Sequence, residues 1–397
     1  MNYIIVGPAW PFRGGIAAFS ERLAYQLIQE GHDVKLYTFT LQYPSLLFPG
    51  TTQFSTDPAP AGLDIRRRFS SVNPFSWLRA RREIRRERPD VVVFAYWMSF
   101  MAPCFGTIAA GLGKNVKRIG LIHNLIPHEP GLLDKLLPPW FVRRMDGFLT
   151  LSQSVADDVK SLLSTRLKPE KNLQSSIFNL QSKKIAVTPH PLYDHYGVLL
   201  PKAEARSALG LDADGRYVLF FGLVRAYKGL DLLLEALADV RCTMYDVRLV
   251  VAGEFYDDEQ PYRDRIQALG LSGRVVLHDH FIPSDEVARY FSAADIVCQP
   301  YRSATQSGVT QIAYHFCKPM LVTDVGGLAE IVPHAPVGTG PSAGSVGYVV
   351  PPDPAAIADA LADFYAHRRE VPFTAAAAEE KKKYAWPRLT QALYGLL

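Results

Sequence analysis

Residues 217–237, YVLFFGLVRAYKGLDLLLEAL, combine an apolar run, a basic loop and a helical repeat of leucines. The run 217–221 has no charged residue, which is typical of a parallel strand buried on both faces. The leucines of 230–237 then recur at the spacing of one helix face. With a further apolar run at 247–252, the stretch predicts a βαβ unit with a right-handed crossover.

The same alternation of strands and helices runs through both halves of the chain. In the second half we expect further strands at 247–252, 275–278, 296–299, 320–323 and 347–350. In the first half we expect strands at 3–6, 34–39, 91–94, 119–122 and 148–151, with a helix over 16–28 that ends at Gly31. The pattern predicts an α/β protein with two Rossmann-like, doubly wound parallel-sheet domains.

Two prolines separate the halves. The segment Thr188-Pro189-His190-Pro191-Leu192 favours a stiff, extended connector, so we place the boundary there. The expected domains are 1–190 and 191–372. In the tail 373–397, apolar residues at helical spacing follow Pro387, which suits a helix start, and predict a terminal helix with an apolar face that must dock.

Composition excludes several classes of protein. The 397 residues include 43 Lys and Arg against 39 Asp and Glu, a net charge of +4, which is low for a protein that binds nucleic acid through its phosphates. The four cysteines form no CxxC pair, and His128-Glu129 has poor spacing for a metal site, so we expect reduced thiols and no bound metal. The first residues do not resemble a signal peptide, and no apolar run is long enough to span a membrane, so a cytoplasmic location is expected.

Candidate ligand-binding residues follow the predicted strands, where ligands bind in parallel sheets. Gly14 and Gly15 precede the first helix, where backbone amides can approach a phosphate; the alternative is a plain tight turn. His123 follows the strand 119–122 and can hydrogen-bond to sugar hydroxyls or phosphate; the alternative is a satisfied histidine at a strand end.

Two basic residues precede the helix of the second half. Arg225 and Lys228 lie where the helix dipole disfavours cations, so they indicate an anionic partner such as a diphosphate rather than merely solvated side chains. The small residues of 303–311 precede another helix and expose backbone amides; an ordinary capped loop is the alternative.

A basic run with aromatic neighbours occupies 66–88, where Glu83 and Glu87 are the only acidic residues. Such a stretch can lie on an anionic membrane surface. The alternative is a solvated helix with Arg–Glu pairs within it.

In order and spacing, these segments resemble the family 4 glycosyltransferases of the GT-B fold, over essentially the whole chain and most strongly at 217–332. The motifs that carry the resemblance are Gly14-Gly15, His123, Phe221-Gly222 with Lys228-Gly229-Leu230-Asp231, Val250-Val251-Ala252-Gly253-Glu254, Ala294-Asp295-Ile296 and Asp324-Val325-Gly326-Gly327-Leu328-Ala329-Glu330. The resemblance implies two domains facing a central cleft, with 373–397 as a helix that crosses back to the N-terminal domain.

The resemblance also implies retaining transfer from a nucleotide-sugar, which is a UDP-, GDP- or dTDP-sugar, with no metal or other cofactor. Arg225, Lys228 and the amides of Gly14 and Gly15 would meet the diphosphate, and His123 would approach the sugar. The remaining donor-binding residues would be Ile282 near the base, the amides of Gly308, Val309 and Thr310, and the side chains of Gln306 and Gln311.

The chain departs from the family pattern at two places. Many members carry R-x4-K directly after the glycine, but Leu223 stands at the arginine position and Arg225 lies two residues later. Many also carry E-x7-E, and here those positions are Ala304 and Ile312, with Gln306 and Gln311 as nearby polar substitutes.

The expected acceptor is a glycan or a lipid-linked sugar in the synthesis of surface polysaccharide or glycoconjugate, held by the N-terminal domain. Alternatives are a sugar epimerase, a phosphorylase, or a non-catalytic binder of nucleotide-sugars that positions a partner. A dehydrogenase is disfavoured because the GxGxxG fingerprint is absent. The basic run leaves open a peripheral contact with the inner face of the membrane.

Overall fold

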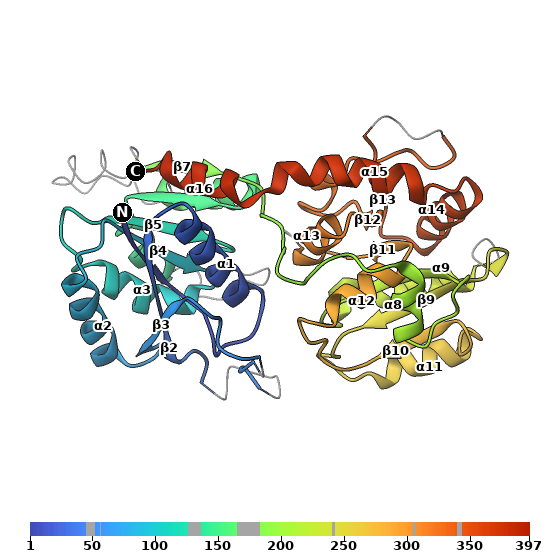
Figure 1. Cartoon of the computed structure of the whole chain (residues 1–397), viewed down its shortest axis with the longest axis horizontal. Coiled ribbons are helices and arrows are strands. Elements are labelled where there is room, and N and C mark those ends of the chain that lie inside the picture. Colours follow the sequence, from blue (N-terminus) through green and yellow to red (C-terminus); the bar gives the residue numbers. More distant parts are fainter. Residues whose placement is uncertain are drawn as a thin grey trace. The chain divides into compact units, whose positions relative to one another are not determined.

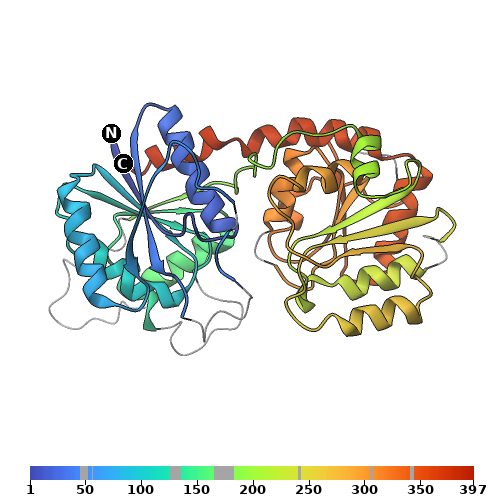
Figure 2. The same ribbon diagram turned by 60° about the horizontal axis from the view of Figure 1, so that its bottom comes forward.

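The computed structural model describes residues 1–44, 52–55, 57–125, 136–164, 183–239, 243–304, 307–339 and 344–397. The chain forms two compact units, of which one comprises Met1–His190 with Trp386–Leu397 and the other comprises Pro191–Ala385. The chain passes from the first unit to the second between His190 and Pro191, inside the proline-rich connector. Each unit contains one parallel sheet with helices on both faces (Figures 1 and 2).

The N-terminal unit has a seven-stranded sheet in the order β3-β2-β1-β4-β5-β6-β7. Its strands are β1 (Asn2–Val6), β2 (Asp33–Leu41), β3 (Asp64–Ser70), β4 (Val91–Tyr96), β5 (Lys117–Ile122), β6 (Gly147–Thr150) and β7 (Lys184–Val187). Its helices are α1 (Gly15–Gln29), α2 (Pro74–Arg86), η2 (Ser99–Met101), α3 (Ala102–Ala109), α5 (Pro138–Val142), α6 (Gln153–Ser164) and α16 (Trp386–Tyr394).

The C-terminal unit has a six-stranded sheet in the order β10-β9-β8-β11-β12-β13. Its strands are β8 (Arg216–Phe221), β9 (Val247–Ala252), β10 (Val275–His278), β11 (Ile296–Gln299), β12 (Met320–Thr323) and β13 (Gly347–Val350). Its helices are α8 (Lys202–Ala208), η3 (Ala226–Lys228), α9 (Leu230–Ala238), α11 (Gln260–Ala268), α12 (Val287–Ala293), α13 (Gly308–His315), η4 (Ala329–Ile331), α14 (Pro354–Ala366), α15 (Glu370–Glu380) and η5 (Lys381–Tyr384).

Each sheet separates two apolar cores. In β1, Ile4 and Val6 pack into one core while Tyr3 and Ile5 pack into the other, because successive strand residues point to opposite faces. The side chains of β8 alternate in the same way between the two cores of its own sheet. Burial on both faces explains why these strands are continuous apolar runs, and it confirms the predicted doubly wound architecture.

Every apolar run predicted as a strand forms one, but β3 and β7 were not predicted. Both strands lie at an edge of the N-terminal sheet. Strand β3 carries Arg66, Arg67 and Arg68, which indicated a charged surface segment rather than a strand. Edge strands need only one paired side and commonly carry charge, so they lack the apolar signal of central strands.

The tail is not the single helix predicted over 373–397. Helix α15 and the turn η5 belong to the C-terminal unit, and α16 belongs to the N-terminal unit. Pro387 has no amide proton and clashes with a preceding helical turn, so it can begin α16 but cannot continue α15. On α16, Trp386, Leu389 and Leu393 join the core that includes residues of α1.

No helix in the described parts of the chain is both long and apolar enough to cross a membrane.

Candidate functional site

A short segment after β8 positions the two predicted cations. Gly222 N donates to Ala252 O at 2.8 Å, and Val224 N donates to Glu254 O at 2.9 Å, so the segment runs beside the chain that leaves β9. Val224 is 1% exposed, and its neighbours in sequence point to the opposite side. After η3, Gly229 has φ 67° and lies so close to Pro300 that a Cβ would come within 2.0 Å of the carbonyl oxygen, which requires glycine there.

Lys228 is a buried cation beside an aromatic ring. It is 9% exposed, and its Nζ lies 5.7 Å from the centroid of the Tyr301 ring. Within the described part of the chain, no carboxylate or other hydrogen-bond acceptor pairs with this Nζ. Burial, with a further contribution from Arg225, lowers the pKa of Lys228 from 10.5 to about 8. A buried charge is costly unless it is paired, so an anion bound beside this Nζ would lower that cost.

Arg225 is held by aromatic rings. Its Cζ lies 3.9 Å from the centroid of the Tyr256 ring and 5.8 Å from that of Tyr227. Arg302, in contrast, donates from both terminal nitrogens to Asp231, at 2.7 and 2.6 Å. Because Asp231 is paired with Arg302, its carboxylate does not neutralise Arg225 or Lys228.

The N-terminus of α13 lies beside these cations. A Cβ built on Gly222 would be 3.5 Å from Lys228 Nζ and 3.7 Å from Val309 Cγ2, which places the basic loop and the helix start around one glycine. Ser307 caps the helix by accepting a hydrogen bond from Val309 N at 3.2 Å. Gly308 packs against Tyr193, where a Cβ would come within 2.9 Å of the ring.

Two polar side chains of α13 are buried. Thr310 exchanges hydrogen bonds with the amide of Gln299 on β11, at 3.1 and 3.2 Å. Gln311 is also buried, and its Oε1 accepts no hydrogen bond from any residue that the structure describes. This orphaned oxygen can accept a hydrogen bond from a ligand hydroxyl.

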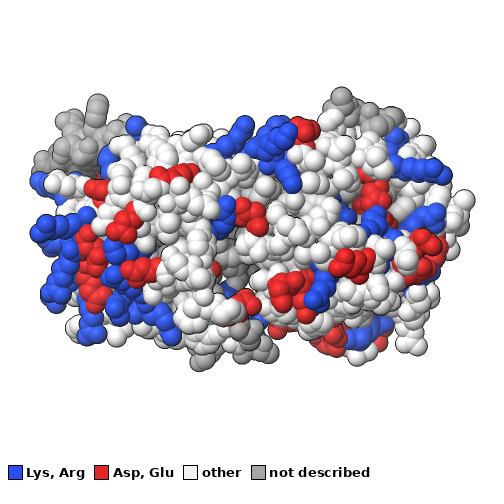
Figure 3. Space-filling model, viewed as in Figure 1, with Lys and Arg blue, Asp and Glu red and all other residues white. Residues whose placement is uncertain are grey.

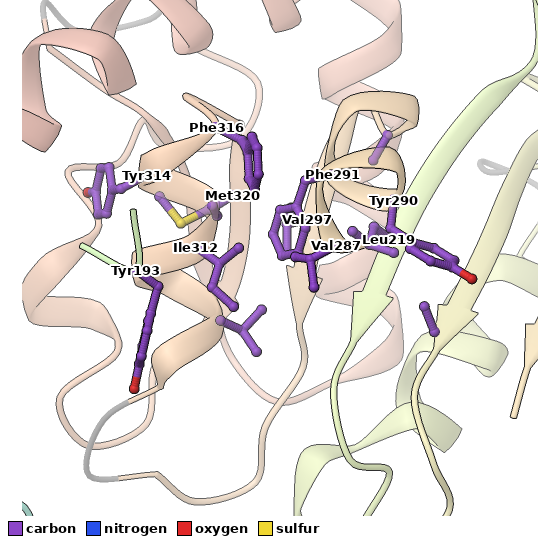
Figure 4. Close-up of a cluster of buried hydrophobic side chains, with 14 of the residues drawn as sticks. Tyr193, Leu219, Val287, Tyr290, Phe291, Val297, Ile312, Tyr314, Phe316 and Met320 are labelled. Carbon is purple, nitrogen blue, oxygen red and sulfur yellow. The ribbon is translucent and has the colours of Figure 1, made fainter. Parts of the chain in front are cut away.

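The positions of the missing family acids lie in the apolar core. Ile312 is 5% exposed and belongs to a buried cluster with Met320 and Phe316 (Figure 4), and Ala304 is buried in the same cluster. A carboxylate at either position would lose its hydration without gaining a partner in that cluster. The core packing therefore accounts for the absence of both acids at Ala304 and Ile312.

The other predicted residues of this unit have different surroundings. The side chain of Ile282 packs in the apolar core, while the adjacent Phe281 is exposed, so a side-chain contact with a base would fall to Phe281. Gln306 lies outside the described residues. No group of three or more His, Cys, Asp or Glu side chains within the described ranges could hold a metal ion, and His128-Glu129 also falls outside them.

In the N-terminal unit, the predicted glycines and His123 lie close together. Gly14, with φ 117°, is the N-cap of α1, and Gly15 is its first residue. One turn later, the Phe19 ring packs edge-on against His123 at 4.8 Å between centroids. The Nε2 atom of His123 is buried and has no hydrogen-bond partner among the described residues, and burial, with a smaller effect of His190, lowers the pKa of His123 to about 3. The imidazole is therefore neutral at physiological pH, which leaves it a hydrogen-bonding role and no charge.

Tyr256 was not predicted as a site residue. The sequence feature that could have identified it is its position after the Gly253-Glu254 motif, which follows β9, the strand that pairs with β8. Neighbouring strand ends meet at one sheet edge, so aromatic residues there can reach a cation on the adjacent loop.

Two family models together match most of the chain. Residues 13–169 match the model described as Glycosyltransferase Family 4, and residues 215–367 match the model described as Glycosyl transferases group 1.

Individual relatives were found among curated proteins. A D-inositol 3-phosphate glycosyltransferase of Segniliparus rotundus is 31% identical over 186 residues, and the match covers 45% of this chain but only 40% of that protein. An uncharacterized glycosyltransferase of Methanocaldococcus jannaschii is 26% identical over 343 residues, covering 81% of this chain and 79% of that protein.

Solved structures share the fold across the whole chain. Anabaena HepE in complex with UDP-glucose has a TM-score of 0.69 at 15% identity, covering 99% of each chain. Sucrose-phosphate synthase from Thermosynechococcus elongatus has a TM-score of 0.68 at 17% identity, covering 100% of this chain and 98% of the other. At these identities the likeness shows the fold alone.

Proposed function

Because this chain belongs to the family 4 glycosyltransferases with the GT-B fold, we propose that it moves a sugar from a nucleoside diphosphate-sugar to a hydroxyl acceptor, with retention of anomeric configuration. The observation that carries the proposal is Lys228, a buried cation beside Arg225 that has no counterion among the described residues. A diphosphate supplies the missing negative charge.

The two cations have a direct role in this chemistry. As the bond between the anomeric carbon and the phosphate oxygen breaks, negative charge grows on the leaving diphosphate. Lys228 and Arg225 stabilise that charge in a partly dry site, where electrostatic interactions are strong. In this proposal the protein's own cations provide the positive charge, and no step is routed through a metal.

Polar groups on α13 suit the sugar. The buried Oε1 of Gln311 accepts no hydrogen bond from the described residues and is available to a hydroxyl, and the N-terminus of α13 lies beside the basic loop. His123 is neutral, so its proposed part is a hydrogen bond to a sugar hydroxyl rather than proton donation.

We propose a glycan or lipid-linked sugar as the acceptor, bound by the N-terminal unit. The name of the Segniliparus relative adds inositol phosphate as a second acceptor class to test. The test is incubation of the protein with UDP-, GDP- and dTDP-sugars and each acceptor class. A glycosylated product supports the proposal. A new sugar phosphate or an epimerised donor favours the alternative enzymes, and binding without turnover favours a non-catalytic role.

Nucleotide binding is expected to weaken above pH 8. In the free protein the pKa of Lys228 is about 8, and a bound diphosphate raises it because the anion favours the charged form. Below pH 8 the lysine is already protonated. Above it, binding must take up a proton, so affinity falls by up to about tenfold per pH unit. Calorimetry from pH 7 to 9.5 measures this fall, and Lys228→Met is expected to lack it. A flat wild-type profile contradicts the role of Lys228.

We also propose that α2 contacts an anionic membrane. Within the described residues Glu83 of α2 pairs with Arg68 at 3.0 Å, and Glu87 just after α2 pairs with Arg66 at 2.6 Å, so both acids pair with β3 rather than with the arginines of α2. Figure 3 shows basic side chains gathered on this side of the unit around a smaller acidic group. Four exposed arginines have no carboxylate partner in the described part of the chain: Arg79, Arg82, Arg85 and Arg86.

An apolar residue continues this basic face. Phe75, which is 83% exposed, stands four residues before Arg79, and Arg82 and Arg86 follow at helical spacing on one stripe. An exposed aromatic beside unpaired arginines suits a membrane interface better than bulk solvent.

Replacing Arg79, Arg82 and Arg86 by alanine is expected to weaken binding to vesicles of phosphatidylcholine with phosphatidylglycerol. At about 1 kcal/mol per arginine, the loss is on the order of 100-fold. Vesicle cosedimentation measures it, with pure phosphatidylcholine vesicles as the control. Equal wild-type binding to both vesicle types, or to neither, contradicts the proposal.

A further inference from the structure

The side chain of Arg225 points to the same side of its segment as Leu223, which occupies the position of the family arginine. Val224 forms a parallel bridge with Phe255 after β9, Arg225 has extended dihedral angles (φ −139°, ψ 152°), and side chains alternate along such a segment. Leu223 and Arg225 are two residues apart, so they point to the same side, while Val224 points into the core. Moving the arginine from position 223 to 225 therefore leaves its side chain on the same side of the segment and moves the charge about 7 Å along the chain.

A charge moved along the chain needs a new support, and Tyr256 provides one. Its backbone N donates to Val224 O at 3.0 Å, which ties the tyrosine to the segment that carries Arg225. Its ring then lies against the guanidinium, with Arg225 Cζ 3.9 Å from the ring centroid. Within the described residues, the side chain of Arg225 makes ring contacts but neither a hydrogen bond nor an ion pair.

The kind of support decides what the arginine can do. Stacking uses the face of the guanidinium and leaves its N–H groups, which lie in the plane, free to donate. Arg302 shows the other arrangement, because Asp231 accepts from both of its terminal nitrogens and cancels its charge. A ring therefore positions the cation without neutralising it.

We propose that Tyr256 is a positioning residue that holds the Arg225 guanidinium with its N–H edge open to the donor diphosphate. This inference rests on the proposed function. It gives Arg225 a role in binding the diphosphate, and it predicts that nucleotide affinity depends on the aromatic ring of Tyr256 rather than on its hydroxyl.

The test compares Tyr256→Ala, Tyr256→Phe, Arg225→Ala and the double variant Arg225→Ala/Tyr256→Ala. The readouts are the affinity for the nucleoside diphosphate that the wild type binds, from a panel of UDP, GDP and dTDP, and the melting temperature. Tyr256→Ala is expected to weaken binding about 5- to 30-fold, the range that corresponds to a desolvated cation–π contact. Tyr256→Phe stays within about twofold of the wild type because phenylalanine keeps the ring.

The double variant separates positioning from general damage. If Tyr256 acts through Arg225, removing the ring has no further effect in Arg225→Ala. Since Tyr256 is 37% exposed, the melting temperature of Tyr256→Ala stays near that of the wild type. Wild-type affinity in Tyr256→Ala, or the same loss in the Arg225→Ala background, overturns the inference alone. No effect of Arg225→Ala, or no nucleotide bound by the wild type, overturns the proposed function with it.

Discussion

Lys228→Met is expected to reduce release of nucleoside diphosphate from the donor by about 10²–10³-fold, the size of effect seen when one preorganised group that stabilises developing charge is removed. The same change is expected to stabilise the fold. Burial and Arg225 lower the pKa of Lys228 from 10.5 to about 8, which corresponds to about 3 kcal/mol for keeping this charge in the folded protein. Methionine has similar length and no charge, so it relieves that cost.

The stabilisation has a defined pH range. Because the folded pKa is below the unfolded one, the cost is fully present below pH 8 and disappears as pH rises toward 10.5. Denaturant unfolding at pH 7 and at pH 10 measures the difference between variant and wild type. Lys382→Met, an exposed lysine of the same unit, is the control for the loss of one charge. Full turnover in Lys228→Met removes this lysine from the mechanism.

Ile312→Glu is expected to destabilise the C-terminal unit by about 3–5 kcal/mol, because it buries a carboxylate among apolar side chains. The variant restores the residue that many family members carry at this position. In this chain, however, the residue at this position packs with Phe316 and Met320 (Figure 4).

Ile312→Val is the matched control, with an expected cost of about 1 kcal/mol for the lost methylene. Denaturant unfolding followed by circular dichroism measures both variants. If Ile312→Glu is as stable as Ile312→Val, the position is not a closed apolar site, and the explanation for the missing acid is wrong.

The central strands could be predicted because burial on both faces makes each one an uninterrupted apolar run. Strand β4, VVVFAY, is buried along its whole length. Strand β3 escaped prediction because an edge strand with Arg66, Arg67 and Arg68 has the composition of a surface segment. The break between α15 and α16 was marked by Pro387, but helical spacing alone did not show that the chain changes units there.

The candidate site was predicted less completely than the fold. Val309 is far in sequence from Gly222 and Lys228, and the parallel pairing of β8 with β11 brings the two loops together. The burial of Lys228, the neutral state of His123 and the orphaned oxygen of Gln311 depend on packing, which residue order does not specify. Tyr256 was missed because its role is defined by a contact across two strand ends.

The most direct test of the donor site is thermal stability of the wild type and Lys228→Met with UDP, GDP, dTDP and CDP. We predict that one nucleoside diphosphate stabilises the wild type, by about 2.7 kcal/mol at 100 times its dissociation constant, and stabilises Lys228→Met far less. Equal stabilisation of both proteins, or no response of the wild type to any nucleotide, would contradict the claim that this buried lysine binds the donor diphosphate.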